Sequence, residues 1–496
     1  MTSVPPSRIR RCNDAPPRPN GRFVLYWMIA ARRTRYNFAL QRAVELGKQL
    51  RRPLVVLEPL RVGYRWASER LHRFVLDGMA DNGARCAAAG VRYFPYLEPA
   101  PGRGQGLLAA LADHACAVVT DESPTFFLPA MVAAAARQLP VQLEQVDGNG
   151  LLPLCLAERA YPTAASFRRL VHRHGPELCG ELPLVDPLAA AGSLGRARLP
   201  RPVLQRWPPT SARVLGKRTG ELLRRLPIDH TVAAVASHRG GPRAAERAWR
   251  EFLRQRLGAY DEQRNHPDQA GASGLSPYLH FGHLSSHQVL AELVRDEGWD
   301  PTRVDLAAAG RRAGFWGMST SAEAFVDQLV TWRELGANAA VHDPEHHASY
   351  RALPDWARQT LADHRGDPRP YCYDLAELTA ARTHDPVWNA AQRQLLVEGR
   401  IHNYLRMLWG KKILQWSPSP RRALAVMVEL NNRFAVDGRD PNSVSGILWT
   451  LGKYDRPWGP ERPIFGKVRF MSSRNTLRKL KLRAYLERWG SEQQGA

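Results

Sequence analysis

Two tryptophans in the segment IHNYLRMLWGKKILQW, residues 401–416, have the spacing expected of electron carriers. Trp409 and Trp416 are seven residues apart. With 3.6 residues per helical turn, their indole rings project from one side of a helix, two turns apart. Trp388, in HDPVWNAAQ, can supply a third ring from a neighbouring helix. This spacing suits electron hopping, although tryptophans seven residues apart more often pack in a core.

A polar, turn-rich segment follows these tryptophans, in VELNNRFAVDGRDPNSVSGILW, residues 428–449. It begins with Asn431 at the end of a predicted helix and continues through residues 437–442, where Asp, Gly, Asn and Pro accept the backbone angles of turns. Arg406, one helical turn before Trp409, is the obvious ion-pair partner for Asp437. In a domain rich in aromatic residues this segment favours a bound cofactor. The alternative is an ordinary capped helix end.

The elements that must position these residues form two domains. Between residues 21 and 175, short apolar runs at 24–29, 54–57, 91–97, 117–120 and 141–146 alternate with helical patterns. This alternation predicts an α/β domain with a parallel, doubly wound sheet of Rossmann-like type. No G-x-G-x-x-G follows the first strand and no Walker A motif occurs, so the sheet is not an obvious NAD or ATP site.

Helical periodicity dominates the second half of the chain. It predicts an all-α domain over residues 231–490, with helices at 248–257, 287–295, 322–337, 387–399, 403–416 and 421–434. Twelve of the fourteen tryptophans lie beyond residue 200. The remaining segments are interpreted as a flexible N-terminus at 1–20, an interdomain linker at 176–230 and a tail at 491–496.

The charge of the chain predicts a polyanionic partner. Its 496 residues contain 70 Lys and Arg against 47 Asp and Glu, a net charge of +23, and residues 400–496 hold 19 basic against 7 acidic residues. Such an excess favours a surface that binds phosphates. A uniformly Arg-rich surface is the alternative, because the excess is not confined to one patch.

Several classes of protein and site are excluded. Apolar runs are much shorter than the roughly 18 residues that span a bilayer, and residues 1–21 lack the apolar core of a secretory signal, so we expect a cytoplasmic protein without a membrane segment. His342, Glu345, His346 and His347 lack HExxH spacing and lie in a loop-like stretch, so no metal site is predicted.

Seven motifs occur together in one order along the chain. They are YWM at 26–28, GASGLSPYLHFGHLSS at 271–286, LVTWREL at 329–335, THDPVWNAAQ at 383–392, the Trp409 helix, NNRFAVDGRDPN at 431–442 and ERPIFGKVRFMS at 461–472. This set resembles the class II cyclobutane pyrimidine dimer (CPD) photolyases of the photolyase/cryptochrome superfamily. The agreement in order and spacing extends from about residue 21 to residue 489, and it is looser in the N-terminal half.

The resemblance implies an antenna domain followed by a helical domain that holds reduced, U-shaped FAD. Three tryptophans match the family's photoreduction relay, which are Trp409, Trp388 and Trp416, with Trp409 nearest the flavin. Asn431 matches the residue that faces flavin N5. Arg406 and Asp437 match the ion pair beside the flavin ring. The further cofactor contacts it implies are Tyr260, Ala272, Ser273, Gly274, Leu275, Ser276, Arg333, Asn338 and Gly438. Small residues with free N–H and hydroxyl groups suit a pyrophosphate.

The resemblance also implies the substrate, which is UV-damaged DNA that contains a pyrimidine dimer. Photolyases rotate such a dimer out of the duplex before they act on it. Trp332 and Trp449 match the aromatic walls of the lesion site, and Arg264 and Arg469 match residues that fill or grip the opened duplex. Five more basic residues are candidate phosphate contacts, although each alone is more often a solvated charge. They are Lys467, Arg474, Arg478, Lys479 and Lys481.

One residue departs from the family pattern. Gln328 stands where the family usually has an acid, four positions before Trp332. An amide donates a weaker hydrogen bond than a carboxylic acid and cannot transfer a proton. The leading hypothesis is therefore a monomeric, FAD-dependent deoxyribodipyrimidine photo-lyase, and the alternative is a cryptochrome-like blue-light photoreceptor that does not repair DNA. The antenna pigment is left open between deazaflavin, folate and none.

Overall fold

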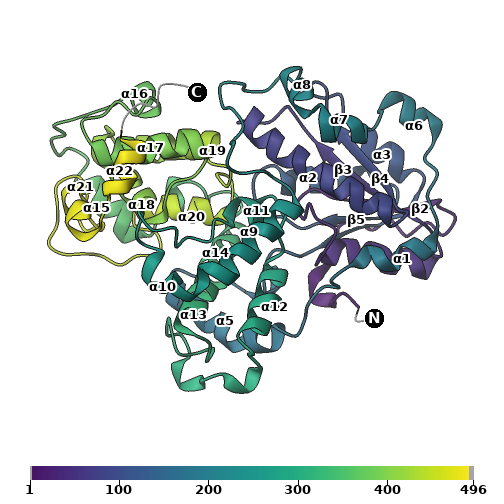
Figure 1. Cartoon of the computed structure of the whole chain (residues 1–496), viewed down its shortest axis with the longest axis horizontal. Coiled ribbons are helices and arrows are strands. Elements are labelled where there is room, and N and C mark those ends of the chain that lie inside the picture. Colours follow the sequence, from purple (N-terminus) through teal and green to yellow (C-terminus); the bar gives the residue numbers. More distant parts are fainter. Residues whose placement is uncertain (1–2, 491–496) are drawn as a thin grey trace.

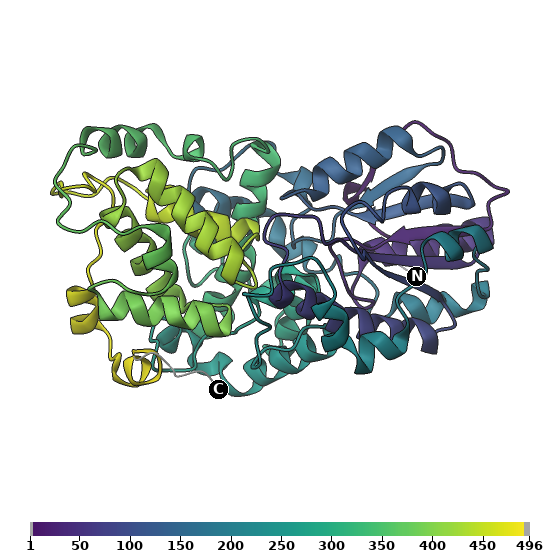
Figure 2. The same ribbon diagram turned by 90° about the horizontal axis from the view of Figure 1, so that it is seen from above.

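The N-terminal part of the chain folds around a six-stranded sheet, seen at the right of Figures 1 and 2. The computed structural model describes residues 3–490, so the predicted tail at 491–496 lies outside the described residues. The sheet has the order β1-β6-β5-β2-β3-β4. Its strands are β1 (Ile9–Arg11), β2 (Phe23–Trp27), β3 (Leu54–Leu60), β4 (Arg92–Leu97), β5 (Ala115–Asp121) and β6 (Leu143–Val146). All neighbouring pairs are parallel except β1 with β6.

Helices cover both faces of this sheet. Helices α1 (Phe38–Leu50) and α2 (Glu69–Ala88) bury side chains against one face, and α3 (Leu107–Ala112), α4 (Leu128–Gln138) and α6 (Arg201–Arg206) bury theirs against the other. Every residue of β2 and β5 is buried, as expected for parallel strands between two helical layers. The predicted doubly wound α/β domain is confirmed.

The strand order places a ligand crevice. The chain leaves β2 for β3 and β4, and then returns to add β5 on the other side of β2. Ligands of open α/β sheets bind where the order reverses in this way, outside the carboxyl ends of the two strands. In this chain that position lies between Trp27, the last residue of β2, and Asp121, the last residue of β5.

The prediction of a flexible segment at 1–20 is wrong for the residues that form β1. Ile9 pairs with Val146 and Arg11 with Glu144 in the sheet. The Arg8 side chain is 1% exposed and donates through Nη2 to the Leu151 carbonyl, 2.6 Å away. A three-residue strand with two arginines has no visible apolar alternation, so only its distant partner reveals it.

The segment 176–230 is not a bare linker. It forms three short helices, α6, α7 (Ala212–Lys217) and α8 (Thr219–Arg224). Val203 and Trp207 join the sheet's apolar core, and Leu215 and Leu223 pack with residues of α2. The predicted α/β boundary at residue 175 also shifts, because α5 (Ala164–Leu178) packs in a cluster made mostly of helical-domain side chains.

The rest of the chain is helical, as predicted, and builds two packed clusters. The first cluster joins α5 to the helices α9 (Pro242–Gln255), α10 (Tyr260–Gln263), α11 (Ser276–His280), α12 (Ser286–Asp296), α13 (Thr320–Val326) and α14 (Arg333–His342). The second contains α15 (Asp355–Asp363), α16 (Leu375–Thr379), α17 (Pro386–Glu398), α18 (Asn403–Trp416), α19 (Pro420–Phe434), α20 (Pro441–Thr450) and α22 (Arg483–Trp489). The short helix α21 (Ser473–Lys479) lies between Met471 and Leu480, which both pack in this cluster. Figure 1 shows the second cluster at the left, opposite the sheet.

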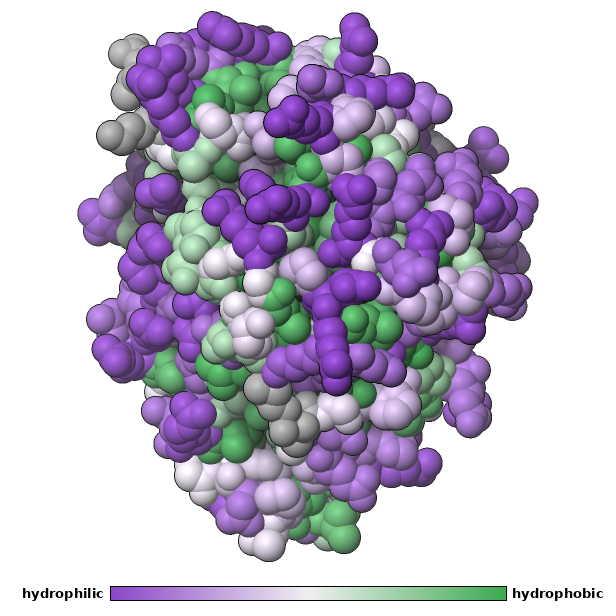
Figure 3. Space-filling model, turned by 90° about the vertical axis from the view of Figure 1, so that its right-hand side faces the viewer, coloured by the Kyte–Doolittle hydropathy of each residue, from purple (hydrophilic) through white to green (hydrophobic). Residues whose placement is uncertain are grey.

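The surface is polar over the face shown in Figure 3. Hydrophilic side chains cover most of that face, and apolar atoms form small groups between them. Within residues 3–490, no helix combines the length and the apolar character that crossing a membrane requires.

Candidate active site

Among the three predicted relay tryptophans, Trp388 contacts both of the others. The Trp388 and Trp409 rings lie 6.4 Å apart between centroids and within 2° of parallel, and the Trp388 and Trp416 rings lie 5.6 Å apart at 72°. Their exposed fractions are 0%, 2% and 2% for Trp388, Trp409 and Trp416. An electron can therefore pass from Trp416 through Trp388 to Trp409 by steps between touching rings.

Local structure holds each ring in place. The Asp385 carboxylate caps α17 by accepting from the backbone N–H groups of Val387 and Trp388, which begins the helix at the Trp388 turn. The Trp388 indole N–H donates to the Trp409 carbonyl at 3.1 Å, and the Trp409 indole N–H donates to Gln392 Oε1 at 2.9 Å. Buried indole groups with satisfied N–H donors have little freedom to reorient.

The predicted ion pair beside the relay is present. Arg406 Nη2 lies 3.5 Å from Asp437 Oδ1, and both side chains are mostly buried. The Asn431 amide donates to the Gly438 carbonyl at 2.7 Å and to Ser443 Oγ at 3.0 Å. A Cβ added to Gly438 would collide with the backbone of residues 431–432, so this loop needs glycine there. The helices α18 and α19, the loop that holds Asp437 and Gly438, and the first turn of α20 thus meet at one polar site.

The predicted phosphate loop, residues 272–276, consists mostly of small residues and has two arginines beside it. Gly274 has φ +71°, and the space of its missing Cβ lies 3.5 Å from Arg400 Nη1. Arg256 Nη1 donates to the Ala272 carbonyl at 2.9 Å, and Ser273 Oγ accepts from the Leu275 N–H at 3.4 Å. Guanidinium groups beside a glycine turn suit an anionic group that approaches the backbone closely.

Tyr260 and Arg264 lie together at the short helix α10. The Tyr260 ring is 7% exposed and packs edge-on against Phe252 and Phe325, each with centroids 5.5 Å away. The Arg264 guanidinium lies 5.7 Å from the Tyr260 ring centroid. Arg264, which is predicted to fill or grip the opened duplex, therefore lies against Tyr260, which is predicted to contact the cofactor.

Gln328 and Trp332 lie on a π-helical segment, η8 (Asp327–Trp332), inserted between α13 and α14. A π-helical turn closes a wider loop than an α-helical turn and occurs often at functional sites. Arg168 anchors the start of this turn by two hydrogen bonds to the Asp327 carboxylate, at 2.7 and 3.2 Å. Both Gln328 and Trp332 are half-buried, so each can face a ligand on one side.

Trp449 and Arg469 belong to a second aromatic and basic group. The Arg469 guanidinium lies 5.5 Å from the Trp449 centroid and 3.9 Å from that of Trp458, and it bonds the Asp455 carboxylate at 2.9 and 3.3 Å. Arg469 is thus held in place by a local carboxylate and two rings. Trp332 and Trp449 are both partly buried against the first helical cluster.

A buried lysine that the sequence interpretation missed lies beneath Trp449. Lys411 is 0% exposed, and its Nζ donates to the Thr450 carbonyl at 2.7 Å and lies 5.0 Å from the Trp449 ring centroid. Burial lowers the pKa of Lys411 to about 7, because the charged ammonium loses its hydration. Its position two residues after Trp409 was the available signal, but a lysine in a helix normally predicts an exposed side chain.

A cavity of about 560 Å³ lies between the two domains, at the carboxyl ends of β2 and β5. Aromatic side chains line its mouth, where the Phe126 ring meets Tyr64 edge-on and lies tilted against Phe127. Arg32, Arg439 and Phe281 line it as well, and Arg439 Nη1 is buried without a hydrogen-bond partner among residues 3–490. An apolar cavity with fixed positive charge suits a planar, acidic aromatic molecule.

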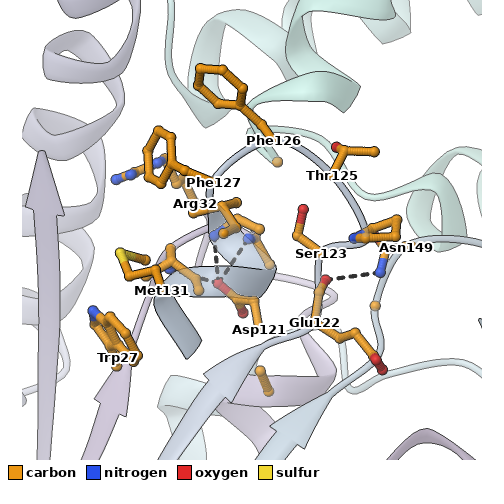
Figure 4. Close-up of a pocket in the computed structure, with 18 of the residues that line it drawn as sticks. Trp27, Arg32, Asp121, Glu122, Ser123, Thr125, Phe126, Phe127, Met131 and Asn149 are labelled. Carbon is orange, nitrogen blue, oxygen red and sulfur yellow. Dashed lines mark hydrogen bonds between the residues drawn. The ribbon is translucent and has the colours of Figure 1, made fainter. Parts of the chain in front are cut away.

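At the bottom of this cavity, the backbone N–H groups of residues 29–31 form a cradle that the Asp121 carboxylate occupies (Figure 4). Its Oδ2 accepts from the backbone N–H groups of residues 29, 30 and 31 at 2.8, 2.8 and 2.9 Å, and its Oδ1 accepts from the Tyr26 hydroxyl at 2.6 Å. Successive N–H groups at a strand end are an anion site. Here the protein's own carboxylate occupies them, so a ligand of the cavity cannot place a phosphate there.

Two of the predicted cofactor residues are found at this cavity. Arg333 and Asn338 both contribute to its lining. The Arg333 guanidinium bonds the Asn149 carbonyl at 2.6 Å, and the Asn338 amide bonds the backbone of residues 159 and 161. The other predicted cofactor residues lie on α10, the 272–276 segment, α18, α19 and the loop between α19 and α20. Arg333 and Asn338 therefore tie α14 to the segment 149–161 by hydrogen bonds.

Among residues 3–490, no group of three or more His, Cys, Asp and Glu side chains is arranged to hold a metal ion. The His342 imidazole instead bonds the Ala157 carbonyl at 2.8 Å.

Comparison with known proteins places the chain in a family. No family model matches it. It is 35% identical over 482 residues to a deoxyribodipyrimidine photo-lyase of Methanothermobacter thermautotrophicus, which covers 97% of both chains, and 32% identical to one of Oryza sativa, which covers 97% of this chain and 90% of the relative. It is 30% identical to one of Potorous tridactylus, over 92% of this chain and 79% of the relative.

A solved structure shares the fold. A bacterial class III photolyase from Agrobacterium tumefaciens superimposes with a TM-score of 0.68 at 17% sequence identity, covering 95% of this chain and 86% of the other. At that identity the likeness concerns the fold alone, and it agrees with the predicted photolyase/cryptochrome architecture. The extended similarity to the curated relatives carries the assignment, and the chain belongs to the deoxyribodipyrimidine photo-lyase family.

Proposed function

We propose that the protein is a monomeric, light-driven lyase that opens cyclobutane pyrimidine dimers in cytoplasmic DNA, with FAD as its catalytic cofactor. Family membership supports the reaction. The observation that carries the proposal is the chain of ring contacts that joins three buried tryptophans. Its first member, Trp409, lies one helical turn after Arg406, which pairs with Asp437. A redox cofactor between that ion pair and Trp409 gives the relay a purpose that plain core packing does not.

The residues present fit FAD. The 272–276 loop, with Arg256 and Arg400 beside it, would hold the pyrophosphate. Tyr260 would pack against the same part of the cofactor. Reduced FAD, when bound, supplies the photoexcited electron that opens the dimer.

The ion pair and Asn431 would bind and tune the flavin ring. Arg406 would place positive charge next to it, and Asp437 would keep that guanidinium in position. Asn431 already uses its amide donors on Gly438 and Ser443, which orients the amide firmly. Its Oδ1 accepts from the Ser443 hydroxyl at 3.3 Å, and its second lone pair would accept from a flavin N–H.

The lesion site would be built by Trp332 and Trp449, between which the flipped dimer stacks. Gln328, one helical turn before Trp332 on the π-helical segment, would donate an amide hydrogen bond to a carbonyl of the dimer. An amide stabilises developing negative charge at that carbonyl less than a carboxylic acid does. Repair by this chain is therefore expected to be slower than repair by a variant with an acid at this position.

The interdomain cavity would hold an antenna pigment. Its volume, its aromatic mouth and the unpartnered Arg439 Nη1 support a flat, anionic chromophore. Because Asp121 fills the N–H cradle at residues 29–31, a pigment anchored through its ring system fits better than one anchored there through a phosphate. Arg439 is two residues from Asp437, so one loop would touch both the pigment and the flavin site.

The test is blue-light repair of an oligonucleotide that carries a thymine dimer, by purified protein whose FAD has been reduced. We expect loss of dimers in the light and none in the dark. Protein that contains FAD but leaves the dimers intact in the light would be a photoreceptor of the cryptochrome kind. Protein purified without any FAD, and unable to take it up, would contradict the cofactor assignment itself.

A further inference from the structure

The proposed relay ends at a tryptophan that solvent does not reach. Trp416 is 2% exposed, and its ring faces the Lys412 ammonium at 5.5 Å. Once Trp416 has given up an electron it carries a positive charge in a buried site, and a buried charge without hydration is costly. The charge therefore needs a neighbour that can be oxidised and that lies closer to the surface.

Two aromatic side chains besides Trp388 contact Trp416. The Tyr373 ring meets it edge-on with centroids 5.3 Å apart, and the His384 ring lies 5.4 Å away at 65°. Tyr373 is half-buried and His384 is exposed, so this pair connects the relay to solvent. Of the two, only the phenol is readily oxidised.

The Tyr373 hydroxyl is bonded as a proton-coupled electron donor requires. It lies 2.6 Å from His384 Nδ1 and accepts from the His384 backbone N–H at 3.0 Å. With its lone pairs engaged by that N–H, the hydroxyl donates its own proton to Nδ1. An oxidised phenol is a strong acid, and a base within 2.6 Å takes its proton as the electron leaves.

We propose that Tyr373 is the terminal electron donor of the relay and that His384 is the base that accepts its proton. This inference rests on the proposed photoreduction relay. One electron passes from Tyr373 to the oxidised Trp416, which returns to neutral tryptophan. The phenolic O–H bond breaks, its proton forms a bond with His384 Nδ1, and the products are a neutral tyrosyl radical and an imidazolium.

The cycle closes with an external thiol. The thiol gives a hydrogen atom to the tyrosyl oxygen, which restores Tyr373 and leaves a thiyl radical, and the imidazolium releases its proton to water. Tyr371, which is 50% exposed and stacks on His384 with centroids 3.8 Å apart, is not in ring contact with Trp416. It shields one face of the imidazole and supplies the matched control.

The experiment identifies the radical that remains after a blue flash on the FAD-loaded protein, without thiol, by electron paramagnetic resonance. Three samples are compared, one unlabelled, one with ring-deuterated tyrosine and one with ring-deuterated tryptophan. We expect the signal of the long-lived radical to narrow only with deuterated tyrosine. A signal that narrows only with deuterated tryptophan overturns the inference and leaves the relay in place. No light-induced protein radical in any sample overturns both.

Variants test the assignment to one residue. Tyr373→Phe keeps a ring against Trp416 and removes the hydroxyl, so we expect the tyrosyl signal to disappear and the remaining radical to decay at least about tenfold faster, equivalent to about 1.4 kcal/mol of lost stabilisation. Tyr371→Phe should retain the wild-type radical. A tyrosyl signal that survives in Tyr373→Phe and is lost in Tyr371→Phe overturns the assignment.

The role of His384 has its own readouts. His384→Gln retains a polar acceptor but not a base, so the rise of the tyrosyl signal should slow by about tenfold or more. A solvent isotope effect on that rise in D₂O is expected in the wild type and lost in the variant. Nitrogen-15 NMR of the protein in the dark should show a hydrogen-bonded, unprotonated Nδ1. A protonated Nδ1, or an unchanged rise in His384→Gln, overturns the base assignment.

Discussion

The indole rings of Trp388 and Trp409 lie within 2° of parallel with centroids 6.4 Å apart, although they belong to different helices. The bond from the Trp388 N–H to the Trp409 carbonyl ties α17 to α18 at this contact. Trp388 also contacts Trp416. Within residues 3–490 it is therefore the only one of the three tryptophans whose ring contacts both of the others.

Trp388→Phe should therefore interrupt light-driven flavin reduction. A smaller ring that is harder to oxidise stands between the two remaining tryptophans, and the rate of photoreduction should fall by at least about tenfold, which corresponds to a barrier increase of about 1.4 kcal/mol. The measurement is the absorbance change of bound FAD under steady blue light.

Trp207→Phe is the control for loss of a buried tryptophan, because Trp207 packs against the sheet in the α/β domain. It should photoreduce like the wild type. Trp409→Phe should behave like Trp388→Phe, while chemically reduced Trp409→Phe should still repair dimers. Unchanged photoreduction in both relay variants would remove the relay.

Gln328→Glu should accelerate repair. A protonated carboxylic acid donates a stronger hydrogen bond to a dimer carbonyl than an amide does, by roughly 1 kcal/mol, so the rate of dimer opening should rise by up to about tenfold. FAD content should stay the same, and Gln328→Leu, which removes the donor, should be slower than the wild type. A Glu variant that repairs more slowly would indicate that the site is adapted to the amide.

Arg406→Met should reduce FAD retention and stability. The variant leaves the Asp437 carboxylate mostly buried without its partner, at a cost of about 1–3 kcal/mol for a pair separated by 3.5 Å. Urea unfolding and the flavin-to-protein absorbance ratio measure the two effects. The double variant Arg406→Met with Asp437→Leu should recover part of the stability without recovering FAD, and recovery of neither would argue against a direct pair.

Lys411 should make the stability of the protein increase with pH above 7. Burial lowers its pKa in the folded protein to about 7 from the ordinary value of 10.5. Between those values the unfolded chain binds more protons than the folded one, so the free energy of unfolding rises with pH, by about 2 kcal/mol from pH 7 to pH 9 from this group. Below pH 7 both states are protonated and the dependence vanishes.

The comparison of urea unfolding for Lys411→Met and the wild type isolates this effect. The two proteins share every other group that titrates in this range. The difference between their free energies of unfolding should therefore change by about 2 kcal/mol from pH 7 to pH 9. Lys481→Met removes an exposed lysine and should follow the wild-type curve. Parallel pH curves for Lys411→Met and the wild type would show that Lys411 titrates normally.

Arg474→Ala should weaken binding to damaged and undamaged DNA alike. Arg474 lies exposed in the first turn of α21, whereas Lys467 is paired with Glu461 at 3.4 Å. Loss of one phosphate contact lowers the slope of log K against log salt by about 0.9. Fluorescence anisotropy between 50 and 200 mM salt measures it. Lys467→Ala should change the slope less, and a change confined to damaged DNA would assign Arg474 to the lesion.

Periodicity and local motifs were sufficient for part of this molecule. Apolar runs such as residues 24–29 identified the parallel strands, most clearly β2 and β5, which are buried along their whole length between two helical layers. The seven-residue spacing of Trp409 and Trp416 identified α18, and the position of Arg406 one turn earlier identified its pairing with Asp437. These inferences succeeded because each depends on residues close together in the chain or on a strong motif.

Patterns in the amino-acid sequence were enough to predict the family, the two-domain plan and the candidate relay. The folded structure was needed to reveal the pairing of β1 with β6, the burial of Lys411, the hydrogen bonds of Asp121 to the backbone of residues 29–31 and the contact of Tyr373 with Trp416. Most of these relationships join segments that are distant in the sequence, and the burial of Lys411 places inside the protein a residue type that is usually exposed. Propensity and spacing describe neighbours along a chain, whereas packing selects neighbours in space, so those four relationships required the folded molecule.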